Sequence, residues 1–307
     1  MKKLLLILLL PIGLAAQNTF KTAEVDVNAT LKGTLYTPDV TKKTPLLILF
    51  SGSGPTDRDG NQPGVKSDNL KLLAEASAKQ GIAVYSFDKR IIAMINSGNI
   101  DETKLSFDDY VKDAKDVITF FKNQKKYSKI VLGGHSEGSL VAILATTGYA
   151  DALISIAGPG RSIDKIITEQ VAKQAPNLQP EIEKYFGILK KGETFKLEDQ
   201  TLAMLFRESV QPYMISWMKY DPVAEIKKIK VPTLIINGSK DIQVGESEAQ
   251  LLKAAKPDAK IVIVPDMNHI FKTIKGDESE NYESYNKPEL PISEAFVSAV
   301  NSFIKTL

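Results

Sequence analysis

Residues 133–139 read GGHSEGS and directly follow the apolar run at 130–132. Residues 134–138 match the pattern G-x-S-x-G, and a helical pattern follows them. A buried strand that leads straight into a helix needs a sharp turn, and glycine on both sides of Ser136 leaves room for it. The serine would then project at the carboxyl end of the strand, where open α/β sheets bind ligands. Five-residue matches of this kind also arise by chance, so the surrounding sequence has to support this interpretation.

Apolar runs and helical patterns alternate on both sides of this turn. Strands that are apolar throughout and alternate with helices are typical of a parallel sheet covered on both faces. Residues 23–36 alternate in character and predict an antiparallel strand or hairpin before the main sheet. The sequence therefore predicts an α/β fold with a mostly parallel central sheet. Strands are expected at 45–50, 82–87, 129–132, 152–157, 231–236 and 260–264, and helices at 67–80, 106–124, 139–148, 246–255 and 292–306.

The alternation stops between residues 161 and 222, where only helical patterns occur. We interpret residues 161–222 as a helical cap inserted over the ligand-binding edge of the sheet. The core that carries the sheet would then comprise residues 17–160 and 223–307. The alternative is one continuous domain with extra peripheral helices.

The amino terminus reads MKKLLLILLLPIGLAAQNTF, a basic start followed by an apolar stretch and two small residues. This arrangement predicts a signal peptide over residues 1–16, cleaved before Gln17, and export to the periplasm or the medium. A retained anchor is the alternative, although the apolar run is short for a membrane span. We expect no stable membrane insertion after cleavage.

Charge and cysteine content narrow the class of protein. The 307 residues include 39 basic and 37 acidic side chains, and cleavage would remove Lys2 and Lys3 and no acidic residue. The basic count then falls to 37 and equals the acidic count. A net charge of zero gives the protein no general attraction to nucleic acid or to an anionic membrane. The chain has no cysteine and two histidines, which excludes thiol nucleophiles and disulfides and disfavours a metal site.

A nucleophilic serine needs a base, and the chain offers only two histidines. His135 adjoins Ser136, and the sharp turn should direct the two side chains apart. His269 follows the last expected strand, so we assign it as the base. Asp241 follows the penultimate strand at the same edge of the sheet and is the preferred orienting carboxylate, with Asp266 and Glu246 as alternatives. The chain order Ser136, Asp241, His269 is that of one class of catalytic triad.

The negative oxygen that forms during acyl transfer needs backbone N–H donors. We expect one from Glu137, the residue after the nucleophile, and the other from the loop Ser51-Gly52-Ser53-Gly54. Ser53 is the preferred donor in this loop, and Gly54 is the alternative.

With these residues in place, the sequence resembles the α/β-hydrolase family. GHSEG around Ser136, NGSKD ending at Asp241 and MNHIF around His269 stand where that family carries its triad. The loop GSGPTDRDGN (52–61) is similar to that of exported bacterial esterases and serine-peptidase-like hydrolases. Ser51 stands where many relatives have histidine. The resemblance implies a covalent acyl-enzyme on Ser136 that is hydrolysed by water, with no metal or organic cofactor.

The substrate pocket is less well defined by the sequence. Most of the large apolar residues of the helical segment should pack the cap onto the sheet. Tyr213, Trp217 and Met218 either do the same or line an acyl or aryl pocket. Gly54 and Arg58 are further candidates, although Arg58 can equally pair with neighbouring aspartates and hold its loop.

Residues 275–290 are acidic and polar, and favour a solvated, mobile loop over a border of the entrance.

These features together predict a carboxylesterase that cleaves small-molecule esters of small or medium acyl groups. An aminopeptidase or a thioesterase on the same fold is the alternative, and a catalytically silent binding protein is the hypothesis from another class. The sequence does not predict the oligomeric state.

Overall fold

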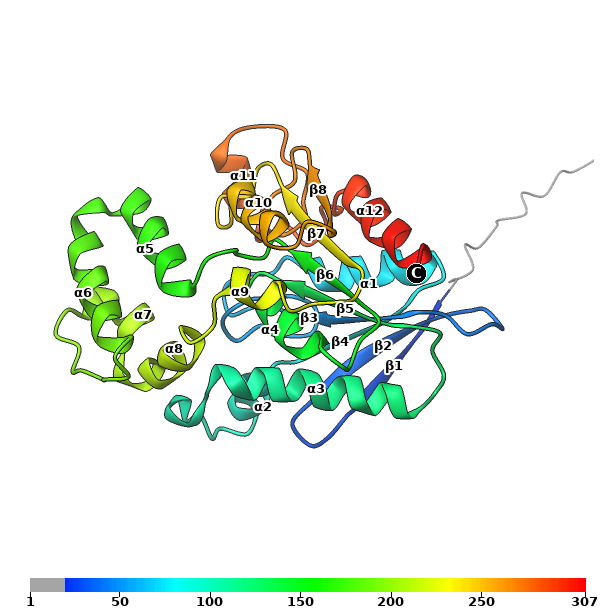
Figure 1. Ribbon diagram of the computed structural model, residues 1–307, viewed down its shortest axis with the longest axis horizontal. Helices are drawn as coiled ribbons and strands as arrows, with labels where there is room; N and C mark the ends of the chain where they lie inside the picture. Colours follow the sequence, from blue (N-terminus) through cyan, green and yellow to red (C-terminus); the bar gives the residue numbers. More distant parts are fainter. Residues whose placement is uncertain (1–19) are drawn as a thin grey trace, which may run out of the picture.

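The computed structural model describes residues 20–307 (Figure 1), so the predicted signal peptide lies outside the described part of the chain. Eight strands in this part form one sheet in the order β1-β2-β4-β3-β5-β6-β7-β8. β1 and β2 pair antiparallel with each other, β2 pairs antiparallel with β4, and the remaining neighbours are parallel. The strands are β1 (Phe20–Asp26), β2 (Lys32–Pro38), β3 (Leu46–Phe50), β4 (Ala83–Phe87), β5 (Ile130–His135), β6 (Ala152–Ile156), β7 (Thr233–Gly238) and β8 (Lys260–Val264).

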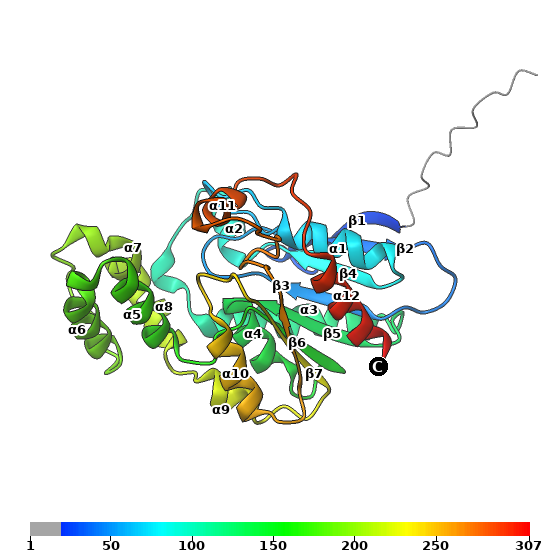
Figure 2. The ribbon, with the colours of Figure 1, turned by 90° about the horizontal axis from the view of Figure 1, so that it is seen from above.

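Helices cover both faces of the sheet, as Figure 2 shows from above. Apolar side chains of α1 and α12 pack on one face, and those of α3, α4 and α10 pack on the other. Every residue of β3 to β7 is buried, which explains why these strands are apolar throughout. The helices outside the 161–222 segment are α1 (Asn69–Lys79), α2 (Arg90–Asn96), α3 (Phe107–Asn123), α4 (Glu137–Thr146), α9 (Pro222–Ile226), α10 (Glu246–Ala255), α11 (Glu278–Ser284) and α12 (Glu294–Lys305).

The segment between β6 and β7 is helical and lies together at one end of the molecule, coloured green in Figure 1. It projects beyond the end of the sheet from which α4 and the loop after β6 emerge, and α8 contacts α3 of the core. Its helices are α5 (Ile163–Gln174), α6 (Gln179–Leu189), α7 (Ala203–Phe206) and α8 (Gln211–Trp217). Short 3₁₀ helices occur at Glu102–Lys104, Pro176–Leu178, Gln200–Leu202 and Glu208–Val210.

The predicted fold class is confirmed by this mostly parallel sheet and its two helical layers. The expected strand 260–264 and helix 246–255 coincide with β8 and α10. Within residues 20–307, no helix is both long enough and apolar enough to cross a membrane.

The expectation of a mobile loop at 275–290 is wrong, because the structure has helix α11 there. The Asp277 side chain caps this helix by accepting hydrogen bonds from the N–H groups of Ser279 and Glu280. Two of its polar residues, Asn281 and Ser284, are buried and bind the Asn268 side chain at 2.9 and 2.8 Å. A polar helix can therefore be fixed in place by hydrogen bonds to the loop that carries His269.

Candidate active site

Ser136 lies on a strained turn between the last residue of β5 and the first residue of α4. Its φ and ψ are 54° and −120°, a conformation that costs a non-glycine residue about 1–3 kcal/mol. The flanking glycines are required by close packing: a Cβ on Gly134 would lie 2.1 Å from the Gly138 carbonyl oxygen, and one on Gly138 would lie 2.4 Å from that of Phe50. The turn predicted from GHSEG is therefore present, with the serine at the carboxyl end of the central strand.

His269 is oriented by Asp241, as the sequence predicts. Its Nδ1 lies 2.7 Å from Asp241 Oδ2, and both side chains are buried. The other oxygen, Asp241 Oδ1, accepts hydrogen bonds from the N–H groups of Gln243 and Val244 at 2.9 and 2.8 Å. These contacts fix the carboxylate, and the carboxylate in turn fixes the imidazole with Nε2 as its remaining nitrogen.

The alternative carboxylates lie elsewhere. Asp266 pairs at 2.7 Å with Lys275 at the surface, and Glu246 is exposed at the start of α10. The structure therefore brings Asp241, and neither alternative, to the histidine.

His135 takes a different role from His269. Its Nε2 lies 2.9 Å from the His269 carbonyl oxygen, and its ring packs edge-on against Phe271. Burial and the neighbouring His269 hold the pKa of His135 well below its usual value of 6.5. A neutral ring that donates from Nε2 supports the backbone of His269, which agrees with the expectation that His135 is not the base.

Two backbone N–H groups next to Ser136 are free to bind a ligand. Among hydrogen bonds within residues 20–307, none is donated by the N–H of Ser53 or of Glu137. The Ser53 carbonyl oxygen accepts hydrogen bonds from the Gln62 side-chain amide at 2.7 Å and from the Thr56 hydroxyl at 3.0 Å. The N–H of Gly54, the alternative donor, is likewise unused in this part of the chain.

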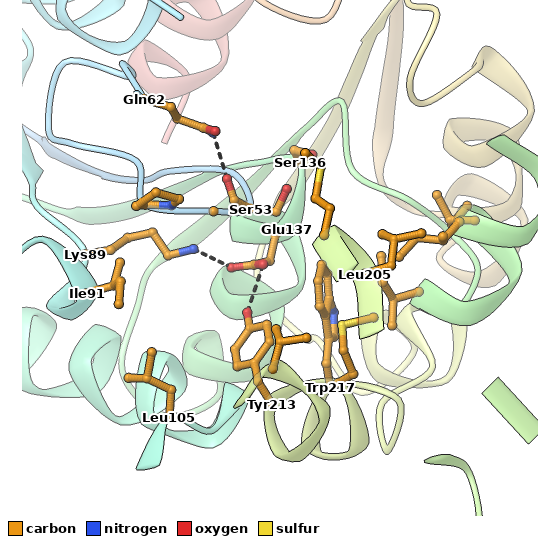
Figure 3. A pocket seen from close by; sticks show the side chains of 18 of the residues that line it. Ser53, Gln62, Lys89, Ile91, Leu105, Ser136, Glu137, Leu205, Tyr213 and Trp217 are labelled. Atoms are coloured by element: carbon orange, nitrogen blue, oxygen red, sulfur yellow. Dashed lines mark hydrogen bonds and ion pairs between the residues drawn. The ribbon is translucent and has the colours of Figure 1, made fainter. Parts of the chain in front are cut away.

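A buried ion pair that the sequence analysis missed connects the two donor residues (Figure 3). Lys89 Nζ lies 2.7 Å from Glu137 Oε1 and 3.0 Å from the Gly52 carbonyl oxygen. That carbonyl and the Ser53 N–H belong to one trans peptide group and so point in opposite directions. Lys89 therefore fixes the direction of the Ser53 N–H. Its position in Asp88-Lys89-Arg90, directly after a buried strand, was the available signal.

Two cavities meet at Ser136. The larger has a volume of about 540 Å³ and extends between the core and the helical segment, with Glu137 in its wall. The smaller has about 280 Å³ and includes His269 in its wall. Four residues line both cavities: Ser53, Gln62, Ser136 and Gln243. The apolar wall of the larger cavity comes from core and helical segment alike, and includes Leu105, Ile163, Ile166, Ile167, Leu205, Val210, Met214 and Trp217.

The predicted pocket residues are only partly brought together. Gly54, Tyr213 and Trp217 line the larger cavity, and the Tyr213 hydroxyl donates to Glu137 Oε2 at 2.8 Å. Met218 does not line it. This residue follows the last residue of α8, and Met214, within the helix, takes the place in the wall that Met218 was expected to have.

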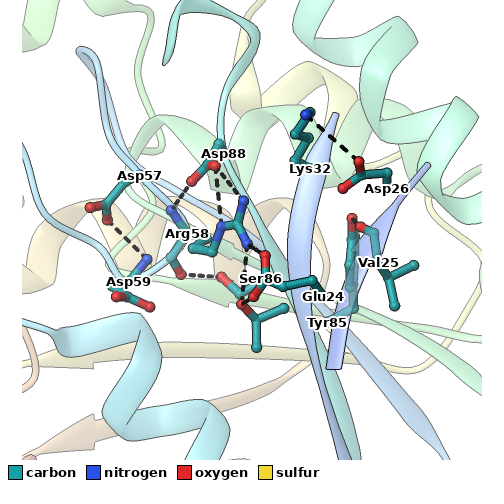
Figure 4. A network of polar contacts seen from close by, with 11 residues as sticks. Glu24, Val25, Asp26, Lys32, Asp57, Arg58, Asp59, Tyr85, Ser86 and Asp88 are labelled. Carbon is teal, nitrogen blue, oxygen red and sulfur yellow. Dashed lines mark hydrogen bonds and ion pairs between the residues drawn. The ribbon is translucent and has the colours of Figure 1, made fainter. Parts of the chain in front are cut away.

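Arg58 lies outside both cavities, so its assignment to the pocket is corrected. Figure 4 shows the polar contacts that it makes instead. Its guanidinium binds Asp88 Oδ2 through Nε at 3.1 Å and through Nη2 at 2.7 Å, and it also contacts Glu24 on β1. Its own N–H donates to Asp88 Oδ1 at 2.8 Å. Arg58 therefore holds the loop after β3 to the edge of the sheet, the structural alternative weighed from the sequence.

Comparisons with known proteins agree with this arrangement. Residues 64–272, more than half of the chain, match the family described as "Serine aminopeptidase, S33". Esterase EstD from Thermotoga maritima is 26% identical over 275 residues, which cover 88% of this chain and 64% of EstD. The chain thus spans less than two thirds of the length of that curated relative.

Solved structures share the fold at low sequence identity. Est1E from Butyrivibrio proteoclasticus superposes with a TM-score of 0.59 at 17% identity, covering 93% of this chain and 98% of Est1E. The esterase Pf2001 from Pyrococcus furiosus gives a TM-score of 0.54 at 18% identity, with 94% and 91% covered. The strained serine turn, the sheet and the match over residues 64–272 lead to one conclusion: this chain belongs to the serine aminopeptidase S33 family of α/β-hydrolases.

Proposed function

We propose that this protein is a serine carboxylesterase that cleaves small-molecule esters of small or medium acyl groups. The proposal is supported chiefly by Ser136 and His269 lining one cavity, with Asp241 bound to His269 and with unused backbone N–H groups at Ser53 and Glu137 within residues 20–307. His269 takes the proton of Ser136, and the hydroxyl oxygen attacks the ester carbonyl. The N–H groups of Ser53 and Glu137 bind the resulting negative oxygen. The alcohol leaves with the proton from His269, and water then releases the acid by the same steps in reverse order.

The position of each cavity supports an assignment of the two halves of the ester. The leaving oxygen must reach His269 to receive its proton, and His269 borders the smaller cavity. The acyl half must then extend into the larger cavity, on the side of Glu137. This cavity has a largely aliphatic and aromatic wall and a volume in the usual range for small-ligand pockets, which favours an apolar acyl group.

The family match makes an aminopeptidase the second candidate, and the charges in the cavity argue against it. An aminopeptidase must hold a free ammonium group, which calls for an unpaired carboxylate. The two carboxylates that line the larger cavity are already paired: Glu137 with Lys89 and Tyr213, and Glu102 with Arg207 at 2.6 Å. A neutral ester needs no such partner.

Labelling and turnover test the proposal. A fluorophosphonate should label the wild-type protein and the exposed-serine control Ser97→Ala, and should not label Ser136→Ala. His269→Ala should lower kcat on nitrophenyl butyrate at least roughly thousandfold. Aminoacyl nitroanilides should be cleaved far more slowly than nitrophenyl esters of two to eight carbons. Labelling that persists in Ser136→Ala would refute the assigned nucleophile, and faster cleavage of the anilides would favour the aminopeptidase.

We also propose that the helical segment 161–222 acts as a cap over the site, and that the enzyme works outside the cytoplasm after removal of residues 1–16. The wall residues that α5, α7 and α8 contribute to the larger cavity support the first point. The basic and apolar start of the sequence supports the second. Cell fractionation and amino-terminal sequencing of the exported protein test the second point.

A further inference from the structure

The smaller cavity differs from the larger one in the chemistry of its wall. The side chains of Ile270, Leu70 and Val65 are its apolar members, and most of the others carry hydroxyl or amide groups. These polar wall residues are Ser53, Thr56, Gln62, Ser67, Asn69, Gln243 and Tyr285. Ser53, Gln62 and Gln243 also line the larger cavity, so they lie where the two cavities meet. In Figure 3, Gln62 lies on one side of Ser53, and Trp217, which lines the larger cavity alone, lies on the other.

Several of these polar groups have hydrogen-bonding capacity left over. Asn69 is 2% exposed, and within residues 20–307 its Oδ1 accepts from the Ser67 hydroxyl while its Nδ2 donates no hydrogen bond. The Tyr285 hydroxyl accepts from the Gln243 amide at 2.8 Å, and its own hydrogen has no acceptor in the same part of the chain. Gln62 donates through Nε2 to Ser53 and Thr56, which leaves Oε1 free to accept. Gln62 and Tyr285 are half-buried, so water can bind their free positions in the cavity, and the hydroxyl groups of a ligand can take the place of that water.

We infer that the smaller cavity binds the alcohol half of the substrate, and that this alcohol carries further hydroxyl groups, as a glycerol or sugar ester does. The inference rests on the proposed function, because only an ester has its leaving oxygen next to His269. Hydroxyl groups on the alcohol can accept from Asn69 Nδ2 and from the Tyr285 hydroxyl, and can donate to Gln62 Oε1. An aliphatic alcohol of the same shape leaves these groups unpaired, and sites built for hydrogen bonds discriminate strongly against such analogues. The substrate class is therefore an apolar acyl group on a hydroxyl-rich alcohol.

A matched pair of esters tests the inference. Glycerol 1-monobutyrate and 2-methylbutyl butyrate have the same acyl group, and methyl groups in the second replace the two free hydroxyls of the first. We expect kcat/KM to be roughly tenfold higher for the glycerol ester. Tyr285→Phe should reduce that ratio roughly threefold, and Asn69→Asp, which keeps the oxygen that Ser67 binds, should reduce it as well. Tyr282→Phe is the matched control, because Tyr282 is 54% exposed and lies outside the cavity, and it should leave the ratio unchanged.

The outcomes separate this inference from the proposed function. Equal or faster cleavage of 2-methylbutyl butyrate, with nitrophenyl butyrate still turned over, would overturn the inference and leave the esterase in place. A ratio that falls no further in Tyr285→Phe and Asn69→Asp than in Tyr282→Phe would also overturn it. Loss of turnover on every ester, nitrophenyl butyrate included, would refute the proposed function and the inference with it.

Discussion

Lys89→Met should slow the reaction, because the Lys89 ammonium orients a backbone donor of the site through the Gly52 carbonyl. Lys89 holds the Gly52 carbonyl at 3.0 Å, and the other end of that peptide group is the Ser53 N–H. Loss of an entire donor to the negative oxygen lowers kcat by roughly 10²–10³. The variant keeps the donor and loosens it, so we expect kcat to fall roughly 10- to 100-fold, or about 1.4–2.7 kcal/mol of transition-state stabilisation. KM on nitrophenyl butyrate should change little, because the ester carbonyl in the ground state carries little charge.

The same change also breaks a buried ion pair, and the assay must separate the two effects. The Lys89 and Glu137 side chains are 9% and 1% exposed, so an unpaired Glu137 costs about 3–5 kcal/mol of unfolding free energy. Lys89→Met/Glu137→Gln removes the unpaired charge and should recover much of that stability. Its kcat should nevertheless stay low, because the Gly52 carbonyl still lacks its donor.

Binding of a trifluoromethyl ketone gives a second readout, since its hemiketal adduct with the Ser136 hydroxyl resembles the tetrahedral reaction intermediate. Affinity for the ketone should fall in parallel with kcat/KM, while affinity for the butyrate product should not. A double variant with wild-type kcat would refute the argument, because the effect would then be one of stability. So would a single variant whose kcat is reduced while ketone affinity is unchanged.

Two further predictions concern stability. Because the pKa of buried His135 is held well below 6.5, the unfolded chain takes up a proton below that pH and the folded chain does not. Urea titrations at pH 7.5 and 5.5 should therefore show that the free energy of unfolding falls by about 1.4 kcal/mol more in the wild type than in His135→Gln. An equal fall in the two proteins would contradict this prediction. Arg58→Leu should lower the unfolding free energy by about 2 kcal/mol through loss of its bonds to Asp88, with KM unchanged. A raised KM with normal stability would restore Arg58 to the pocket.

The sequence predicts the sheet and the reacting groups well because both have local signatures. A strand buried on two faces must be apolar along its whole length, and the expected segments match β3 to β8 closely. The turn at Ser136 needs glycines at fixed positions because the backbone of Phe50 and Gly138 comes so close. The chain has two histidines, and His269 can be chosen as the base because it follows the last strand of the sheet.

The missed features depend on partners far apart in the chain. Lys89 and Glu137 are 48 residues apart, and the position of Lys89 after a buried strand does not indicate which residue it pairs with. The packing of α11 depends on Asn268 binding Asn281 and Ser284, while the segment itself looks solvated. Its helix start could have been found, since Asp277 is followed three residues later by Glu280, a recognised capping pattern. The wall position of Met214 in place of Met218 depends on where α8 ends, and helix ends are poorly marked in sequence.

The costs that the fold bears around Ser136 favour an active enzyme over a silent binding protein. Ser136 has a positive φ, and the buried charged pair Lys89–Glu137 lies beside it. The strained backbone and the burial of charge each lower the stability of the fold. A binding protein could use the same cavities with a relaxed turn and an apolar contact in place of Lys89 and Glu137. The strain and the buried charges are useful only if the hydroxyl must face His269 and the Ser53 N–H must keep one direction during the reaction. Strain and buried charge are thus concentrated where acyl transfer requires fixed geometry, and the large apolar core on both faces of the sheet offsets them.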